Sequence, residues 1–157
     1  MEIRELSISE VKDALLLIKE VFLATEAKEC TPDGISVFLD SLKVDDFIGM
    51  IREEQYVLLG AFADEDILAG VLGARGNFLL LLFVGRRYSG VGYGRSLLEN
   101  YIKRIKGGER TYREILTNAS LGAVKFYEKM GFRVFGDEMV VSGVPYRPMT
   151  MRFSEDA

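Results

Sequence analysis

Hydrophobic residues in the first third of the chain recur at the three- to four-residue spacing of amphipathic helices. The first such helix follows a short strand over residues 1–6 and begins at a capping box formed by Ser7 and Glu10. A second helix is predicted to begin at Thr31–Pro32, with the threonine as N-cap and the proline at the first helical position. A third, short helical segment is expected around residues 46–53. The residues that the first two helices should bury are Val11, Leu15, Ile18, Phe22, Ile35, Phe38, Leu39 and Leu42.

From Gln55 onward the pattern changes to the continuous hydrophobic runs that are typical of strands. Residues 56–63 and 67–74 flank a short acidic turn, which predicts an antiparallel hairpin. A third run, over residues 77–84, follows closely enough to extend the hairpin into a three-stranded meander. Its nearly uniform hydrophobicity predicts burial on both faces and a central position in the sheet.

The second half of the chain alternates between helix and strand. A helix that ends at Gly107–Gly108 is followed by a strand near residues 112–117, a helix near 121–130, a strand near 132–135 and a closing strand near 146–153. The buried stripe of the first of these helices is Leu97, Leu98, Tyr101, Ile102 and Ile105. These elements predict an α/β fold with a mixed sheet and helices on both of its faces.

The strand over residues 77–84 ends in a glycine-rich turn that runs directly into a helix. Glycines at positions 90, 92 and 94 let an anion approach the backbone without meeting a Cβ atom, and the unpaired amides of a helix N-terminus attract negative charge. Three arginines flank the turn and add guanidinium donors. We therefore expect a phosphate-bearing ligand here, in preference to a turn whose glycines serve packing alone. The arginines are Arg86, Arg87 and Arg95.

Two familiar phosphate-binding patterns do not fit this turn. The Walker pattern closes with Gly-Lys-Ser/Thr, whereas this chain has Gly94-Arg95-Ser96 and lacks the required earlier glycine. The dinucleotide fingerprint needs Gly-x-Gly-x-x-Gly in an early βαβ unit, whereas here the strands before the turn form a hairpin. A nucleotide-binding module of another kind stays open as an alternative.

Length and charge narrow the class of protein. The 157 residues fit a single domain over residues 1–157, and the net charge of −4 argues against nucleic-acid binding and mildly favours a cationic partner. Because the single cysteine cannot form an internal disulfide, and the N-terminus lacks the pattern of a signal peptide, we expect a cytoplasmic protein. No apolar run is long enough to span a membrane.

Histidine is absent from the sequence, which removes whole classes of chemistry. Ser-His-Asp and Cys-His hydrolysis, histidine-ligated zinc and histidine general bases are all excluded within one chain. Acid–base chemistry must use tyrosine, carboxylates, lysine, cysteine or water, and no metal is expected.

Two ordered motifs carry a resemblance to a known family. The segment Arg87-Tyr88-Ser89-Gly90-Val91-Gly92 resembles the acyl-CoA signature of the Gcn5-related N-acetyltransferase (GNAT) superfamily. Asn118-Ala119-Ser120 and the segment from Phe126 to Phe132 resemble the second signature, Tyr-x-x-x-Gly-Phe, at the expected distance downstream. The resemblance covers nearly the whole chain and implies a mostly antiparallel sheet with a splayed parallel strand pair that binds acyl-CoA.

The resemblance also implies positions for the CoA moiety. Its pyrophosphate would lie on the backbone amides of residues 89–95, and its pantetheine arm along the backbone of Phe83 and Val84, opposite a strand near Leu116 and Thr117. Asn118 matches an asparagine that contacts the CoA arm, although it could equally be the N-cap of the next helix. The residues implied to bind the cofactor are Phe83, Val84, Arg87, Tyr88, Ser89, Gly90, Val91, Gly92, Tyr93, Gly94, Arg95, Asn118 and Tyr127.

The implied reaction is attack by a primary amine on the thioester of acetyl-CoA. The backbone N–H of Val84 is the candidate donor to the oxyanion, and Tyr127 matches the family's general acid, which protonates the leaving thiolate. From the residues alone, Tyr127 is equally a packing residue of an apolar helix.

The proton acceptor and the amine itself are not identified by the sequence. The five carboxylates considered as general base are Glu26, Glu29, Asp33, Glu114 and Glu138, with none preferred. Substrate recognition is expected from residues 24–34 and 137–146, whose acidic residues suit a small-molecule or peptide amine. The alternatives to an N-acetyltransferase are a non-catalytic acyl-CoA binding or sensing domain and a nucleotide-binding module. The closing strands offer edges through which a homodimer could form.

Overall fold

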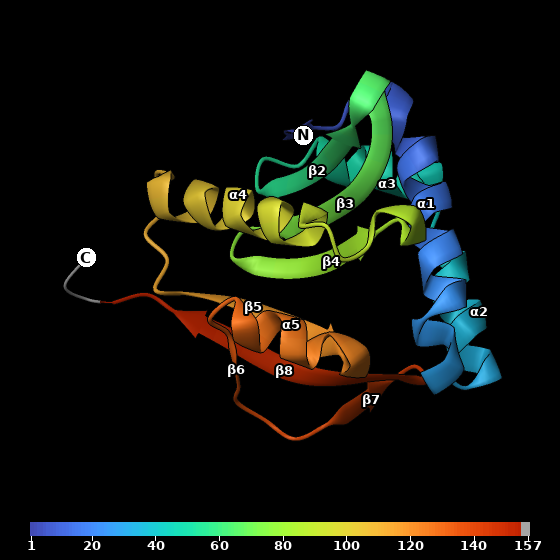
Figure 1. Ribbon diagram of the computed structural model, residues 1–157. Helices are drawn as coiled ribbons and strands as arrows, with labels where there is room; N and C mark the ends of the chain where they lie inside the picture. Colours follow the sequence, from blue (N-terminus) through green and yellow to red (C-terminus); the bar gives the residue numbers. More distant parts are fainter. Residues whose placement is uncertain (155–157) are drawn as a thin grey trace.

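One open sheet, drawn in Figure 1, runs through the whole of the molecule. The computed structural model describes residues 1–154, and its strands follow the order β1-β2-β3-β4-β5-β8-β6, with β7 paired to β8. Every neighbouring pair is antiparallel except β4–β5, which is parallel. The strands are β1 Glu2–Glu5, β2 Tyr56–Ala63, β3 Ile67–Arg75, β4 Phe78–Val84, β5 Glu114–Ser120, β6 Arg133–Val134, β7 Met139–Val141 and β8 Val144–Arg152.

Helices cover both faces of this sheet, as predicted (Figure 1). Helices α1 (Val11–Ala24), α2 (Pro32–Asp40) and α3 (Val44–Ile51) pack on one face, and α4 (Tyr93–Gly107) and α5 (Val124–Lys129) on the other. Each face has its own hydrophobic core, one around Ile18 and Phe22 of α1 and the other around Leu97 and Leu98 of α4. Short 3-10 turns lie at Ile8–Glu10, Glu26–Glu29, Asp64–Asp66, Arg86–Tyr88 and Leu121–Ala123.

The predicted helix starts are present and are held by side chains. The Thr31 hydroxyl accepts a hydrogen bond from the Gly34 amide at 3.0 Å, which confirms Thr31 as the N-cap of α2. The capping box of Ser7 and Glu10 is also formed, although it precedes a 3-10 turn rather than α1 itself. Because Arg4 donates to both carboxylate oxygens of Glu10 at 2.8 Å, the same box ties β1 to the start of α1.

A β-bulge in β4 changes the direction of the residues that follow it. Gly73 of β3 pairs with Leu81 and Ala74 pairs with Leu79, so Leu80 has no partner in β3. Leu79 and Leu82 therefore pack in the core beneath α4, while Leu81 and Phe83 pack toward α1–α3. The predicted burial of the whole strand on both faces is wrong at Leu80, which is 44% exposed.

The parallel pair β4–β5 joins the two halves of the sheet over a very short distance. Only Phe78 with Leu116 and Leu79 with Thr117 are in register, after which the strands separate. The junction is reinforced by Thr117, whose hydroxyl donates to the Leu79 carbonyl at 2.9 Å, and by Asn77, whose side-chain amide donates to the Glu114 carbonyl at 2.9 Å. The splayed pair predicted from the family resemblance is thus present.

The end of the chain differs from the sequence-based prediction in detail. Strand β6 is two residues long, and β8 begins at Val144. The sequence analysis did not predict β7, which pairs with the first residues of β8 around the turn at Ser142–Gly143. This turn docks on α2, since the Thr31 amide donates to the Gly143 carbonyl at 3.0 Å.

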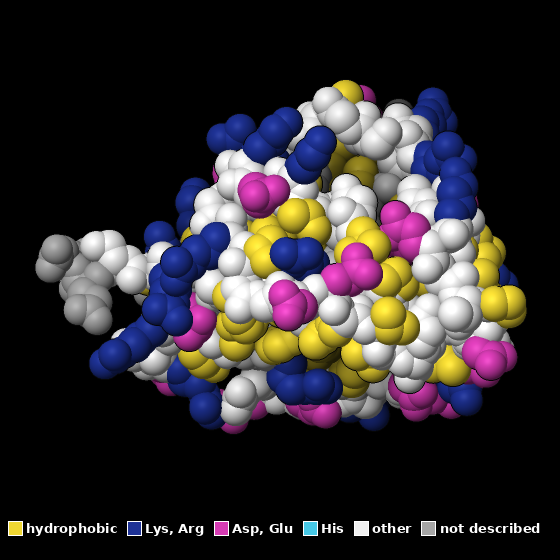
Figure 2. Space-filling model, turned by 90° about the horizontal axis from the view of Figure 1, so that it is seen from below, with side chains coloured by type: hydrophobic (Ala, Val, Ile, Leu, Met, Phe, Trp, Pro, Cys, Tyr) yellow, Lys and Arg dark blue, Asp and Glu magenta, His cyan; other side chains and the backbone are white. Residues whose placement is uncertain are grey.

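Hydrophobic side chains gather on the surface that Figure 2 shows from below, the side on which β6, β7 and β8 lie in Figure 1. The large exposed hydrophobic side chains of this part are Phe135, Met139, Val140 and Val141. The homodimer expected through the closing strands stays a prediction. Within residues 1–154, the helices are too short or too polar to cross a membrane.

Candidate active site

Separation of β4 from β5 creates an opening in the sheet with backbone groups along its edge. The Gly85 amide donates to the Ala69 carbonyl of β3 at 2.8 Å. Because successive amides of a strand point to opposite sides, the amides of Val84 and Leu82 face the opening toward β5. By the same alternation, the backbone of Phe83 faces β3, and Phe83 reaches the opening only through its side chain, which lines it.

Two adjoining cavities fill this opening. The first, of about 310 Å³, lies between the bulge of β4, the α2–α3 region and β5, and the second, of about 280 Å³, lies between Val84 and the turn that follows β5. They share five wall residues, so one leads into the other. The shared residues are Glu26, Leu82, Phe83, Ser120 and Ala123.

The residues opposite Phe83 and Val84 lie further along the chain than predicted, at the end of β5 and in the 3-10 turn that follows it. Leu116 and Thr117 belong to the paired end of the junction, whereas Ser120, Gly122 and Ala123 line the cavity opposite Val84. This difference arises because the register is set at Phe78 and Leu79, about five residues before the end of β4.

The glycine-rich turn has the backbone that close approach of an anion requires. Gly90 and Gly92 have φ angles of +78° and +102°, and a Cβ atom at either position would meet nothing within 4 Å. Gly92 is the N-cap of α4, whose first amides have no acceptor within the helix. Gly94, by contrast, packs against Val84 and Phe126, so its role includes packing.

Not every amide of the predicted loop is free to bind an anion. Those of Tyr88 and Ser89 donate to the carbonyls of Gly85 and Arg86 at 2.8 and 3.3 Å. The remaining candidates are the amides of residues 90–95. Among the side chains, the Arg95 guanidinium donates to Glu99 at 2.7 Å, and Arg87 lies 6.0 Å from the ring of Tyr88. Both arginines are exposed on the same rim.

Tyr127 is packed in the hydrophobic core and also borders the first cavity. Its ring packs edge-on against Phe126 and Phe132, with centroids 5.3 Å apart in each case, and its side chain also lines the first cavity beside Thr117. Burial is the largest influence on the phenol and raises its pKa, an effect that the Thr117 hydroxyl partly offsets. Tyr127 is therefore a core residue that also lines the cavity, in surroundings that favour the neutral phenol.

Asn118 is not a helix N-cap. It lies within β5, where it pairs with Pro148, and the N-cap of the following 3-10 turn is Ser120. Its exposed side chain lines the first cavity. The alternative role considered from the sequence is thus wrong, and a contact with a bound ligand stays the prediction.

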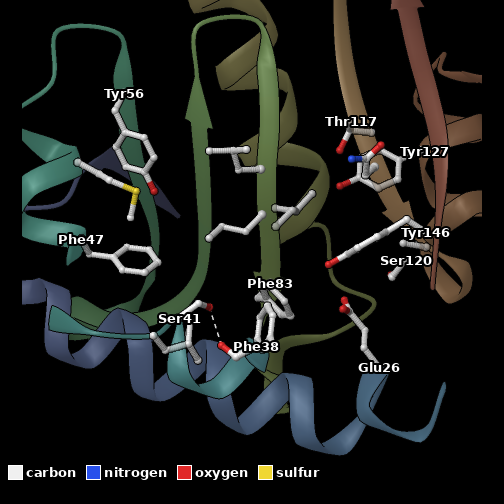
Figure 3. A pocket seen from close by; sticks show the side chains of 17 residues that line it. Glu26, Phe38, Ser41, Phe47, Tyr56, Phe83, Thr117, Ser120, Tyr127 and Tyr146 are labelled. Atoms are coloured by element: carbon white, nitrogen blue, oxygen red, sulfur yellow. Dashed lines mark hydrogen bonds between the residues drawn. The ribbon is translucent and has the colours of Figure 1, made fainter. Parts of the chain in front are cut away.

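One carboxylate of the five candidates stands out. Glu26 points into the opening from the turn after α1, toward Tyr146 and Ser120 (Figure 3). Burial raises the pKa of its carboxyl, the neighbouring Glu29 raises it further, and a hydrogen bond with Ser120 acts in the opposite direction. Glu29 is exposed and lines only the second cavity, whereas Asp33 and Glu138 are exposed and line neither. Glu114 accepts a hydrogen bond from Thr150 at 2.7 Å, away from both cavities.

Several wall residues escaped the sequence analysis. Phe38 was expected only in the core, and Phe47, Tyr56 and Leu80 were given no part in a site; Ser120 and Tyr146 were included only within the motif at 118–120 and the recognition region 137–146. The sequence signal for a shared site was weak because these residues come from six different elements and are brought together only by the tertiary fold. The exposed Leu80, within an otherwise uniform hydrophobic strand, has no sequence signature.

A sheet whose parallel strands separate beside the N-terminus of a helix has the architecture of an acyltransferase whose acyl carrier bears phosphate. The family model described as a GNAT acetyltransferase domain matches residues 26–153. The chain therefore belongs to the GNAT acetyltransferase family, which confirms the resemblance and the enzyme class predicted from the motifs.

Solved structures of the same fold agree with this assignment. The PaiA N-acetyltransferase of Thermoplasma acidophilum, solved with coenzyme A, has a TM-score of 0.81 and 24% identity, with coverage of 97% of this chain and 98% of that one. A ribosomal-protein-alanine N-acetyltransferase of Brucella melitensis has a TM-score of 0.73 and 15% identity, with coverage of 98% of this chain and 100% of that one. A chimera of the spermidine N-acetyltransferase SpeG of Vibrio cholerae has a TM-score of 0.69 and 14% identity, with coverage of 97% of this chain and 96% of that one. A search of curated protein sequences found no match.

Proposed function

We propose that this protein transfers the acetyl group of acetyl-CoA to a primary amine by direct attack. The observation that carries the proposal is the opening between β4 and β5, which leads from Val84, at the end of β4, to Tyr127 and Glu26. This opening connects a site for the donor on one side of the sheet with a cavity for the acceptor on the other.

The residues around the opening fit acetyl-CoA. The pyrophosphate would accept hydrogen bonds from amides of residues 90–95, where the missing Cβ atoms of Gly90 and Gly92 leave room. Arg87 and Arg95 would add charge at the rim. The pantetheine arm would follow the backbone groups of Leu82 and Val84 through the second cavity, and Asn118 would contact it from β5.

Acetyl transfer needs an oxyanion donor and a proton for the leaving thiolate. The Val84 amide faces the opening and is our candidate for the oxyanion donor. Tyr127 is the general acid, and its raised pKa keeps the phenol protonated until transfer. The same burial would raise the pKa of the CoA thiol beside it, so the pKa values of phenol and thiol stay close enough for proton transfer.

Glu26 is our candidate for the group that receives the proton of the amine. It is the carboxylate shared by both cavities, so it adjoins the point where donor and acceptor would meet. Its ionised form attracts the ammonium ion of the free substrate, and its raised pKa makes it a stronger base than an exposed glutamate.

Ligand-induced stabilisation combined with product release tests the proposal. A saturating excess of acetyl-CoA should raise the melting temperature by several degrees. Free CoA should then appear only when a primary amine is added. If acetyl-CoA stabilises the protein and no amine releases CoA, the protein is a binding or sensing domain. Displacement of CoA by ATP or NAD would favour the nucleotide-binding alternative. The cytoplasmic location stays a prediction.

A further inference from the structure

The acceptor cavity has two chemically different ends (Figure 3). Glu26, Ser120 and Tyr146 lie at one end, next to the opening in the sheet. Phe47 of α3 and Tyr56 of β2 lie at the other end, with Phe38 of α2 between them. Phe47 and Tyr56 are almost fully buried, so this end is a lined recess rather than open surface.

Charge in this cavity is confined to one place. Of the described residues that line it, only Glu26 bears a carboxylate, and none is a lysine or an arginine. Tyr56 supplies a phenol at the far end, but burial raises its pKa to about 12, so it is neutral there. The acidic residues of the α3 start, Asp45 and Asp46, face solvent and do not line the cavity.

Further hydrophobic side chains line this cavity, and Met50 lies one turn after Phe47 on α3. The bulge turns Leu80 out of the β3 pairing and leaves it 44% exposed, and Leu81, Leu42 and Met50 complete the apolar wall. An apolar group bound here would remove this surface from water.

We infer, on the basis of the N-acetyltransferase function proposed above, that the acceptor is a monoamine whose ammonium group pairs with Glu26 and whose remainder is an apolar chain or ring. A diamine or polyamine of similar length would carry a second ammonium ion to the end formed by Phe47 and Tyr56. That ion would lose its water there without gaining an opposite charge. The spermidine enzyme that shares this fold is therefore no guide to the acceptor of this chain.

A matched pair of amines tests this inference on the full chain. Hexylamine and hexamethylenediamine have the same carbon chain and differ only in the second amine, and phenethylamine and spermidine extend the comparison. With acetyl-CoA saturating, hexylamine and phenethylamine should exceed hexamethylenediamine and spermidine in kcat/KM by about a hundredfold. The readout is free CoA released per amine.

A charge at the apolar end should weaken the preference. Met50→Glu adds a carboxylate in the wall, and Met50→Gln has nearly the same size without the charge. We expect the hexylamine to hexamethylenediamine ratio to fall by about tenfold in Met50→Glu relative to Met50→Gln. The rise in melting temperature on addition of acetyl-CoA, which measures its binding, should be the same in both variants.

Each outcome has a distinct meaning. Equal or faster acetylation of the diamine by the unchanged protein overturns the inference and leaves the N-acetyltransferase function intact. An unchanged ratio in Met50→Glu, with both variants folded, also overturns it. Failure of every amine to release CoA overturns the proposed function and the inference together.

Discussion

At the scale of single residues, Tyr127 and Glu26 have opposite roles in the proposed proton transfers: Tyr127 donates a proton and Glu26 accepts one. Burial raises the pKa of both groups, but the effects differ because the general acid must hold a proton before the reaction, whereas the proton acceptor must be ionised. Tyr127 stays protonated far above neutral pH. Glu26 is held closer to the pH at which it can exchange a proton with an amine.

Replacing Tyr127 with phenylalanine should lower kcat by about a hundredfold or more, because the leaving thiolate loses its proton donor. The KM for acetyl-CoA and the melting temperature should change little, since the ring that packs on Phe126 and Phe132 is retained. Steady-state kinetics on the variant checks this.

Tyr101→Phe is the matched control, because it also removes one buried hydroxyl, which donates to the Gly76 carbonyl at 2.8 Å, but outside the cavities. If both variants keep full kcat, Tyr127 is a packing residue and not the general acid.

Replacing Glu26 with glutamine should remove the acidic limb from the pH profile of kcat/KM. In the unchanged protein that limb should lie above the ordinary glutamate pKa of 4.5, since burial raises the folded-state value. The same shift predicts the sign for stability: ionisation of a group with a raised pKa disfavours the folded state above that pKa, so Glu26→Gln should melt at a slightly higher temperature at neutral pH.

Glu29→Gln is the control for this prediction, because Glu29 is an exposed neighbour in the same turn and lines only the second cavity. An acidic limb that survives in Glu26→Gln, or that disappears equally in Glu29→Gln, would exclude Glu26 as the proton acceptor.

At the scale of elements, the glycine-rich turn is the feature that ties the function to local sequence. Gly92 has a φ of +102°, so any other residue there is strained by about 1–2 kcal/mol, and its side chain would extend into open space. Both Gly92→Glu and Gly92→Gln should therefore fold with a similar loss of melting temperature.

Only the charge distinguishes these two variants at the ligand. Gly92→Glu should abolish the stabilisation by acetyl-CoA, because it directs a negative group at the site proposed for the pyrophosphate, while Gly92→Gln should weaken it. Thermal denaturation with and without acetyl-CoA measures both effects. A normal shift in Gly92→Glu would mean that the phosphates bind elsewhere.

Periodicity and turn chemistry predicted the elements well because these signals are local. The stripe of α1, the Thr31 cap and the meander of β2–β4 each depend on neighbours within the sequence, and the structure confirms them. Family motifs predicted the strand separation. The bulge at Leu80, strand β7 and the place of Glu26 depend on register and tertiary packing, which no local pattern encodes.

At the scale of the whole molecule, the two halves of the sheet meet at a narrow junction beside the active site. Asn77→Ala should loosen it, because the Glu114 carbonyl loses a partner at 2.9 Å. We expect a loss of about 1 kcal/mol, or a few degrees in melting temperature. Asn100→Ala removes the 2.9 Å hydrogen bond that Arg104 donates to Asn100 on the exposed side of α4, and it should lower the melting temperature by much less. Equal shifts in the two variants would mean that the junction contributes nothing special to stability.

The extra residue in β4 also changes which face of the sheet the odd-numbered and even-numbered residues occupy. Before Leu80 it is the odd-numbered Leu79 that packs under α4, and after it the even-numbered Leu82 does so, while the odd-numbered Leu81 and Phe83 face α1–α3. One inserted residue thus exchanges the two sides of the strand halfway along its length. A β4 of the same length without the bulge would pair Leu80 with Gly73 and shift every later residue by one position. That register would turn the Val84 amide toward β3 and the Phe83 side chain toward α4, so the sites for acetyl donor and amine acceptor would lose the wall that they share.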